Sequence, residues 1–98
     1  MIFAKVVGTV VATQKDEKLN GLKFLIVKPT DLQGNIKSDD YKVCADTVGA
    51  GMGEIVMFVT GSSARQTVVT EAKPVDASIM AIVDISEVNG EITYKKSE

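Results

Sequence analysis

The sequence contains no histidine and no tryptophan, and Cys44 is the single cysteine among its 98 residues. Without histidine the chain cannot form a Ser-His-Asp triad or an imidazole metal site, and it lacks the side chain most often used as a general base. One cysteine excludes an intramolecular disulfide and any multi-cysteine metal site within one subunit, and it suits a reducing compartment. We therefore expect no catalytic activity, no cofactor and no metal.

An excess of positive charge is also lacking. Eleven Lys and Arg against thirteen Asp and Glu give a formal net charge of -2, with a sequence pI of about 5.1, so the basic surface that a polyanion needs is absent. Three Phe and two Tyr are a poor supply for a base-stacking surface. No segment reaches the roughly 18 to 20 uninterrupted apolar residues of a membrane-spanning helix. Neither nucleic acid nor a membrane is an expected partner.

The chain does have many short apolar runs separated by turn residues. Hydrophobic residues make up 45% of the sequence, enough for one compact domain over residues 1–98. The runs are rich in β-branched residues and five to ten residues long, which is typical of an all-β barrel or sandwich. Five to seven strands suit a small Greek-key β-barrel of the OB type with one short helix. Residues 86–98 are expected to form a hairpin and tail.

Turn residues and strand patterns locate the elements. Strands are expected at residues 2–13 with a bend at Gly8, 22–27, 41–48, 55–60 and 79–84, with hairpin turns at Asn20-Gly21 and Asn89-Gly90. The third strand alternates Tyr41, Val43 and Ala45 with Lys42, Cys44 and Asp46. We interpret Cys44 as a small buried hydrophobic residue without a redox role. Residues 55–60 are almost all apolar, which indicates burial on both faces, the second of them by a partner subunit.

The glycine cluster of residues 49–53 is the first candidate site, since such loops can direct backbone N–H groups at a phosphate. A dinucleotide fingerprint would need a glycine where Glu54 stands, and a helix rather than a β-rich run after it. We favour a tight loop between strands whose glycines permit positive φ or the close approach of a neighbouring backbone. Such close approach is expected at a symmetry axis.

The segment 61–65 is the second candidate because it holds Arg65, the one arginine of the chain. A guanidinium can make bidentate bonds in an interface, whereas the alternative is a solvated arginine after a capping serine. We expect a short helical turn over residues 64–68, capped by Ser62 or Ser63. No lysine is placed locally to activate either serine as a nucleophile. The acidic residues lack the spacing of a calcium-binding loop, so we interpret them as solvated turns and caps: Asp39, Asp40, Asp46, Asp76 and Asp84.

Three groups of motifs occur in an order that resembles a known family. They are the stretch 5–10 (KVVGTV), the stretches 46–54 (DTVGAGMGE) and 61–65 (GSSAR), and the stretches 74–77 (PVDA) and 82–84 (IVD). The chain is similar in this respect to bacterial microcompartment vertex proteins of the EutN/CcmL type, from Met1 to about Asp84. The last residues match no motif of that family.

The resemblance implies an OB-like β-barrel that assembles into a cyclic homopentamer. Such a pentamer would close the five-fold corners of a polyhedral microcompartment shell in the cytoplasm, beside hexameric shell proteins and without catalysis. It also implies which residues lie at subunit contacts or near the five-fold axis: Gly49, Ala50, Gly51, Gly53, Glu54, Gly61, Ser62, Ser63 and Arg65. Arg65 would then bond a neighbour's carbonyl or carboxylate. The alternative function is a stand-alone OB-fold binding module for nucleic acid or another ligand.

Overall fold

The computed structural model describes residues 1–13 and 15–97, and its regular structure is almost entirely β. Seven strands and two 3-10 turns follow one another as β1 (Ile2–Val10), η1 (Glu17–Leu19), β2 (Lys23–Pro29), β3 (Lys42–Asp46), β4 (Ile55–Thr60), η2 (Gly61–Arg65), β5 (Ala77–Ile82), β6 (Ile85–Val88) and β7 (Glu91–Lys95). In the described residues no helix is long and apolar enough to span a membrane. The expected all-β class is confirmed.

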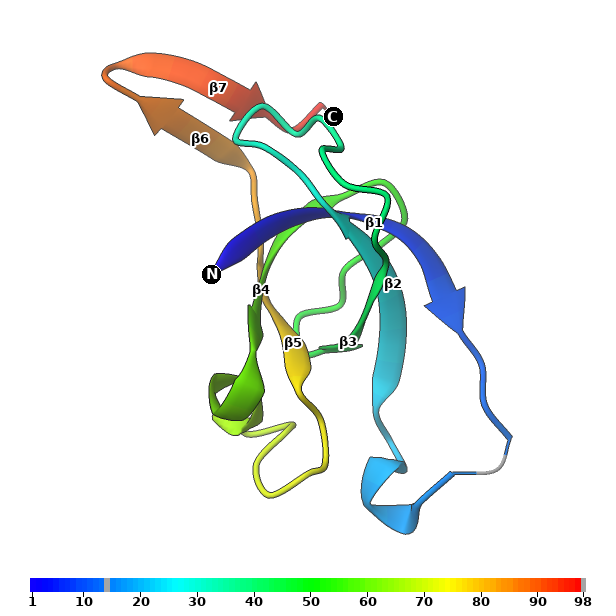
Figure 1. Cartoon of the computed structure of the whole chain (residues 1–98). Helices are drawn as coiled ribbons and strands as arrows, with labels where there is room; N and C mark the ends of the chain where they lie inside the picture. The colour runs from blue at the N-terminus through cyan, green and yellow to red at the C-terminus, as the bar shows by residue number, and fades with distance from the viewer. Residues whose placement is uncertain (14, 98) are drawn as a thin grey trace.

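Five strands close into a barrel in the order β1-β2-β3-β5-β4, with β4 returning to β1 (Figure 1). All neighbouring strands pair antiparallel except β3 and β5, which pair parallel. Closure removes the exposed sheet edges that a flat five-stranded sheet would present. The barrel is therefore the closed OB-like form expected from the strand count.

The first strand bends where the sequence predicted it. The register of β1 against β2 shifts between Val6 and Gly8, and a Cβ on Gly8 would lie 3.4 Å from Cδ1 of Ile26. A glycine at this bulge lets the neighbouring side chain lie against the backbone. The strand is shorter than expected, ending at Val10 rather than residue 13, because its last partner is Phe24 near the start of β2.

Two predictions on short helices were wrong. The turn η2 covers Gly61–Arg65 rather than residues 64–68. Neither Ser62 nor Ser63 caps it, because both lie inside the turn, and Thr60, which occupies the cap position, makes no side-chain cap bond. The chain turns as soon as β4 ends, because Gly61 has φ +68° and donates its N–H to the Asp76 carbonyl at 2.8 Å. The sequence reading also missed η1, whose start is capped by the side chain of Asp16.

Side chains from all five barrel strands and from Ala50 fill the interior. The core cluster is Ala4, Val6, Leu25, Val27, Cys44, Ala50, Val56, Phe58, Ala77 and Ile79. Cys44 is fully buried, and this burial, with the charge of Asp76, raises the pKa of its thiol to about 12. An inert, buried cysteine is what the sequence indicated.

The apolar alternation of the third strand does not mark its inward face. Tyr41 and Val43 are 62% and 51% exposed, whereas Cys44 lies opposite Leu25 in the β2–β3 register. Because Leu25 is a core residue and directly paired residues share a face, Cys44 must point inward. Outside the barrel, the Lys28 ammonium sits 4.6 Å from the centre of the Tyr41 ring, a cation–π contact.

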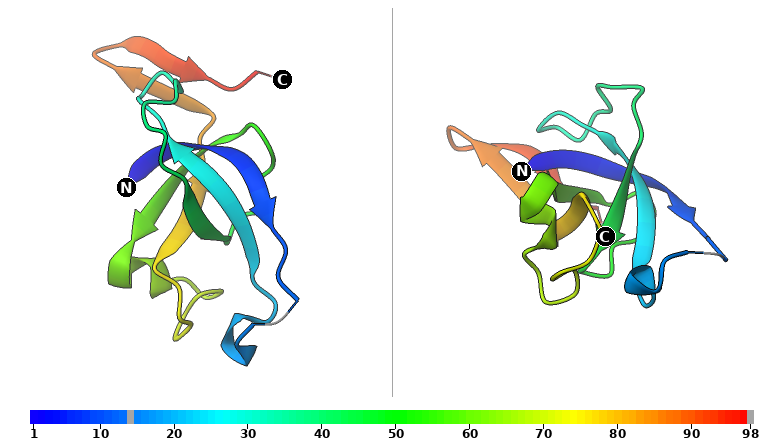
Figure 2. Two further views of the ribbon diagram at one scale, coloured as in Figure 1. Left: turned by 45° about the vertical axis from the view of Figure 1, so that its right-hand side comes forward. Right: turned by 60° about the horizontal axis from the view of Figure 1, so that its bottom comes forward.

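The hairpin β6–β7 stands away from the barrel in every view (Figure 2). Its turn has positive φ at both Asn89 and Gly90 (53° and 82°), as expected for an Asn-Gly hairpin turn. Two contacts with the β2–β3 loop anchor it. Ser86 Oγ donates to the Leu32 carbonyl at 3.1 Å, and a Cβ on Gly34 would lie 3.0 Å from the Tyr94 ring.

The β2–β3 loop and the hairpin bury the outer face of β4 at Ile55 alone, and the expected burial of both faces does not extend to Met57 and Val59, which are half-buried. Ile55 pairs with Lys5 while Val56 pairs with the core residue Ala4, so Ile55 points out of the barrel. It is nevertheless only 3% exposed, and Gly34 lies close to both Ile55 and Tyr94. At Ile55 the outer cover is thus provided by the chain's own loop and hairpin, not by a partner subunit as the sequence suggested.

Candidate functional site

The two candidate segments lie at opposite ends of β4. The glycine loop, residues 47–54, leads into the strand at its upper end in Figure 1, and η2 leaves it at the lower end. The six residues of β4 separate them by roughly 20 Å at about 3.3 Å per residue. The structure therefore does not bring the two segments together within one chain.

A buried carboxylate shapes the first half of the glycine loop. Oδ1 of Asp46 accepts hydrogen bonds from the N–H groups of Val48, Gly49 and Ala50 at 3.1, 3.1 and 3.2 Å, and Oδ2 accepts from Ala50 at 3.1 Å. The Asp46 side chain is 1% exposed, and the exposed Nζ of Lys23 lies 3.9 Å away. Asp46 thus caps the turn, as the sequence indicated, but it does so as a buried anchor for the loop and not as the solvated residue that was expected.

A second carboxylate holds the other half of the loop. Glu54 Oε1 accepts the N–H of Gly51, and Glu54 Oε2 accepts a hydrogen bond from the ammonium of Lys96. The bond from Lys96, the bond from Gly51 and the Lys96 charge lower the pKa of Glu54, and the same pairing raises the pKa of Lys96. Four successive amides, from residue 48 to residue 51, therefore point at the chain's own acids. These amides are engaged internally instead of forming a phosphate cradle.

Glycine is required in this region mainly by backbone conformation. Gly49, Gly53 and Gly61 have φ of +74°, +81° and +68°, and a Cβ on any of them would meet nothing within 4 Å. L side chains rarely adopt such φ values. Gly51 differs, since its φ is not positive and an added Cβ would meet the Glu54 carboxylate, with Oε1 at 3.3 Å and Cδ at 3.9 Å. Within one chain, the expected positive φ is confirmed at Gly49 and Gly53.

Hydrogen bonds to β5 and the residues before it fix the second segment. Ala64 is buried, and its carbonyl accepts a bond from the buried Ser78 Oγ at 2.6 Å. Arg65 Nη1 donates to the Val75 carbonyl at 3.1 Å. The side chains of Ser62, Ser63 and Arg65 are exposed. The segment thus has a fixed backbone and presents polar side chains outward.

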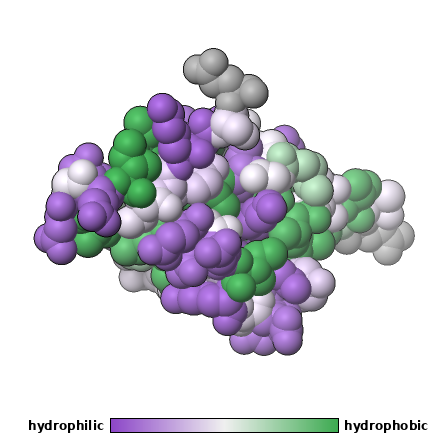
Figure 3. All heavy atoms as spheres, turned by 90° about the horizontal axis from the view of Figure 1, so that it is seen from above, coloured by the Kyte–Doolittle hydropathy of each residue, from purple (hydrophilic) through white to green (hydrophobic). Residues whose placement is uncertain are grey.

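Exposed hydrophobic side chains occur on the hairpin and in loops of the barrel. On the hairpin, Ile85, Val88 and Ile92 are 56%, 43% and 57% exposed, and in the segments that follow β1 and η2 the side chains of Val11 and Val68 are 90% and 95% exposed. Viewed from above Figure 1, hydrophobic residues lie in separate patches between hydrophilic ones (Figure 3). Scattered apolar residues of this kind do not by themselves define one binding surface.

A family model described as "Ethanolamine utilisation protein EutN/carboxysome" matches residues 1–84. The chain belongs to this EutN/CcmL family. The resemblance inferred from the sequence motifs is thereby confirmed, and the hairpin β6–β7 lies beyond the matched residues.

Individual relatives are similar over nearly the whole chain. The carboxysome shell vertex protein CcmL of Nostoc sp. is 46% identical over 99 residues, covering 100% of this chain and 97% of its own. The microcompartment shell vertex protein GrpN of Rhodospirillum rubrum is 45% identical over 87 residues, covering 89% of this chain and 97% of its own. The microcompartment shell vertex protein EutN of Salmonella typhimurium is 40% identical over 96 residues, covering 98% of this chain and 96% of its own.

Solved structures agree with the sequence relatives. The structure of Nostoc sp. CcmL has a TM-score of 0.92 at 46% identity and covers 98% of this chain and 100% of its own. The structure of GrpN from Rhodospirillum rubrum, described as a pentameric microcompartment shell protein, has a TM-score of 0.75 at 44% identity and covers 90% of this chain and 98% of its own. These relatives are structural shell proteins, and they give no support to the alternative of a stand-alone OB-fold binding module.

Proposed function

We propose that this chain is a structural shell protein that forms the pentameric vertex of a bacterial microcompartment. The observation that carries the proposal is the likeness to Nostoc sp. CcmL, with a TM-score of 0.92 over 98% of this chain and 100% of the relative. GrpN, a relative described as pentameric, supports the ring size. The protein is then not an enzyme, and its place is the shell of a microcompartment in the cytoplasm.

The positions of the two candidate segments support a cyclic ring. In a ring each subunit joins the next through two different surfaces, one on each copy. The glycine loop and the segment 61–65 stand at opposite ends of β4, so one copy can offer its loop where the next offers its turn. We propose that the subunit contacts or the five-fold axis contain Gly49, Ala50, Gly51, Gly53, Glu54, Gly61, Ser62, Ser63 and Arg65. Ala50 would take part through its backbone alone, because its side chain lies in the barrel core.

Arg65 has the chemistry for a contact between copies. Its guanidinium carries five N–H donors. Within the described residues, one of them bonds the chain itself, at the Val75 carbonyl. Its side chain is exposed. In the ring, its other donors would bond a carbonyl or a carboxylate of the neighbouring copy, with bidentate geometry where a carboxylate accepts.

Hexameric shell proteins are the proposed partners of the outer rim. A layer of six-fold tiles is flat, and a closed polyhedral shell needs five-fold units at its corners. Mixing the purified chain with hexameric shell proteins should give closed particles in electron micrographs, whereas the hexamers alone should give open sheets or tubes. Closed particles formed equally well without the chain would contradict the vertex role.

The ring itself is tested by native mass. Native mass spectrometry and light scattering at several concentrations and salt levels should give a discrete species of five 10.5 kDa chains. A clean monomer would overturn the proposed function, and oligonucleotide binding would then be the next measurement. A stable ring of another size would reject the pentamer alone.

Substitution of Gly51 tests the glycine loop as a contact. Gly51→Val should abolish the ring, because a bulky side chain would block the close approach of a neighbouring copy that we propose there. It should leave the β-structure of the chain intact, because within the chain the new Cβ would meet only the end of the Glu54 side chain. Circular dichroism and native mass measure these two outcomes separately. A fully pentameric Gly51→Val protein would remove this glycine from the proposed contact.

A further inference from the structure

The end of the C-terminal hairpin returns to the glycine loop. Lys96, the residue after β7, donates its backbone N–H to the Asp84 carbonyl at 2.8 Å, which holds it at the base of the hairpin. Its ammonium bonds Glu54, and Glu54 in turn accepts the N–H of Gly51. A continuous series of polar contacts thus connects the hairpin to the loop, between residues that are 42 positions apart.

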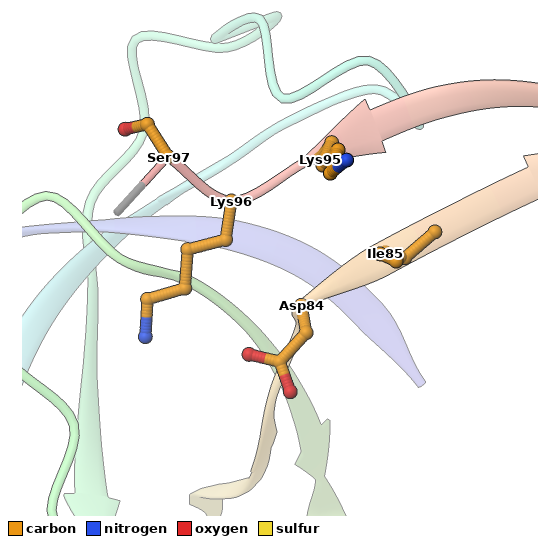
Figure 4. A pocket seen from close by; sticks show the side chains of 5 residues that line it. All are labelled: Asp84, Ile85, Lys95, Lys96 and Ser97. Atoms are coloured by element: carbon orange, nitrogen blue, oxygen red, sulfur yellow. The ribbon is translucent and has the colours of Figure 1, made fainter.

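The geometry distinguishes Lys96 from the lysine beside it. Figure 4 shows Lys96 extending from the end of β7 on the same side as the Asp84 carboxylate, while Lys95 stays beside the hairpin strands. The side chains of Lys96 and Glu54 are 39% and 20% exposed, so solvent screens this ion pair less than a fully exposed one. Lys95 is exposed.

The part of the loop that Glu54 holds has few other restraints. Asp46 binds the amides of residues 48 to 50, and Gly53 donates its N–H to the Val6 carbonyl at 2.9 Å. Gly51 lies between these fixed points. Its carbonyl accepts the Glu54 N–H at 3.3 Å, and its N–H bonds the Glu54 side chain. Glycine loses more backbone freedom on ordering than any other residue. A loop that is already ordered in the free subunit loses less entropy when it meets a partner.

We propose that Lys96 and Glu54 form a latch by which the C-terminal hairpin positions the glycine loop for contact with the next copy. The proposal rests on the proposed function, since it requires the loop to lie in a subunit contact. It adds to that function the claim that Lys96 contributes to the stability of the ring, although Lys96 lies outside the residues 1–84 that match the family model. Lys96 and Glu54 are positioning residues here, acting through the amide of Gly51.

Lys96→Met tests the latch because it removes the charge and keeps a side chain of similar length. The concentration at which half of the rings dissociate, from native mass spectrometry on dilution, should rise by at least about fivefold, the lower end of ordinary coupling between sites. Amide exchange at Gly51 should accelerate in the dissociated chain. Lys95→Met is the matched control and should change neither measurement.

Glu54→Gln provides a second variant that leaves the hairpin unchanged. It keeps a side-chain oxygen able to accept the Gly51 N–H but loses the charge that Lys96 contacts. If the two residues act as one unit, the double variant should weaken the ring no more than the stronger single variant. Additive losses would overturn the latch.

The outcomes also distinguish failure of the latch proposal from failure of the proposed vertex function. A monomeric wild type would overturn both. A pentameric wild type with Lys96→Met dissociating like Lys95→Met would overturn the latch and leave the vertex function standing. Faster exchange at Gly51 with an unchanged ring would also overturn it, because the loop would then be held by Lys96 without mattering to assembly.

Discussion

The two segments that flank β4 keep their shapes by different physical means. The glycine loop depends on charge, because two carboxylates, Asp46 and Glu54, collect its backbone amides. The turn η2 depends on burial and on neutral acceptors, with Ala64 in the interior and its carbonyl bonded to Ser78. The loop should therefore respond to charge substitutions and, through the lowered pKa of Glu54, to pH, whereas the turn should respond to the removal of single buried hydrogen bonds.

The largest effect on folding is expected from Asp46→Ala. This substitution leaves three amides without their acceptor, one of them on the buried Ala50. Val48 and Gly49 are exposed, so their amides can bond water instead, and the main cost comes from the buried Ala50 amide. A hydrogen bond to a charged group contributes about 1.5 to 3 kcal/mol, and we expect the free energy of unfolding to fall by about 3 kcal/mol in urea titrations at pH 7. Asp39→Ala, at an exposed position, should change it by less than about 0.5 kcal/mol. Equal losses would show that Asp46 is no special anchor.

Ser78→Ala should be the single substitution that most weakens the support of the other segment, η2, because Ser78 lies in the neighbouring strand β5 and bonds that turn. Its hydroxyl is fully buried and donates to the Ala64 carbonyl at 2.6 Å, so its loss leaves that carbonyl without this donor. We expect a loss of about 1 to 2 kcal/mol in the free energy of unfolding. Ser63→Ala, at an exposed position of the same turn, serves as the control. Because no charge is involved, the loss should be the same at pH 7 and pH 4, and a strong pH dependence would contradict the contrast between the segments.

Much of the fold could be predicted from local patterns. Short β-branched runs located β4 from Ile55 to Thr60, and the Asn89-Gly90 pair located the hairpin turn, because both signals depend on neighbouring residues alone. The inward face of β3 could not be found in this way. It is set by the register with β2, a contact between distant segments that overrides the local alternation.

The candidate site was predicted only in part for the same reason. The glycine-rich segments were visible because unusual backbone conformations need glycine. Asp46 was interpreted as part of a solvated turn or cap. Its carboxylate does cap the turn that contains Gly49, but its burial carried no local signal. Lys96 carried no local signal, since its partner Glu54 lies in a different part of the chain.

Glycine substitutions in the loop should have smaller effects that differ from one position to the next. Gly53→Ala forces a side chain into φ +81°, a conformation that costs roughly 1 to 2 kcal/mol for an L residue. Gly51→Ala needs no such conformation and should cost less than about 0.5 kcal/mol. Thermal unfolding of the two variants side by side measures the difference. A greater loss at Gly51 would mean that contact with Glu54, not backbone conformation, limits this loop.

The smallest expected effect is the change with pH in the stability difference between wild type and Glu54→Gln. It tests the charge at position 54 separately from the shape of the side chain. The folded state lowers the pKa of Glu54 below its ordinary value of 4.5 through Lys96 and the Gly51 amide. A carboxyl with a lowered pKa stabilises the fold above its unfolded pKa, and this contribution is lost as the pH falls through the folded value.

The stability difference between wild type and Glu54→Gln should therefore be constant above about pH 5.5, where both pKa values have been passed, and should shrink as the pH falls below 4.5. Urea titrations across pH 3 to 7 measure it. Ser78→Ala is the control, because its difference from wild type should not change over this range. A Glu54→Gln difference that is equally flat would mean that the loop is held by the shape of the side chain at position 54 and not by its charge.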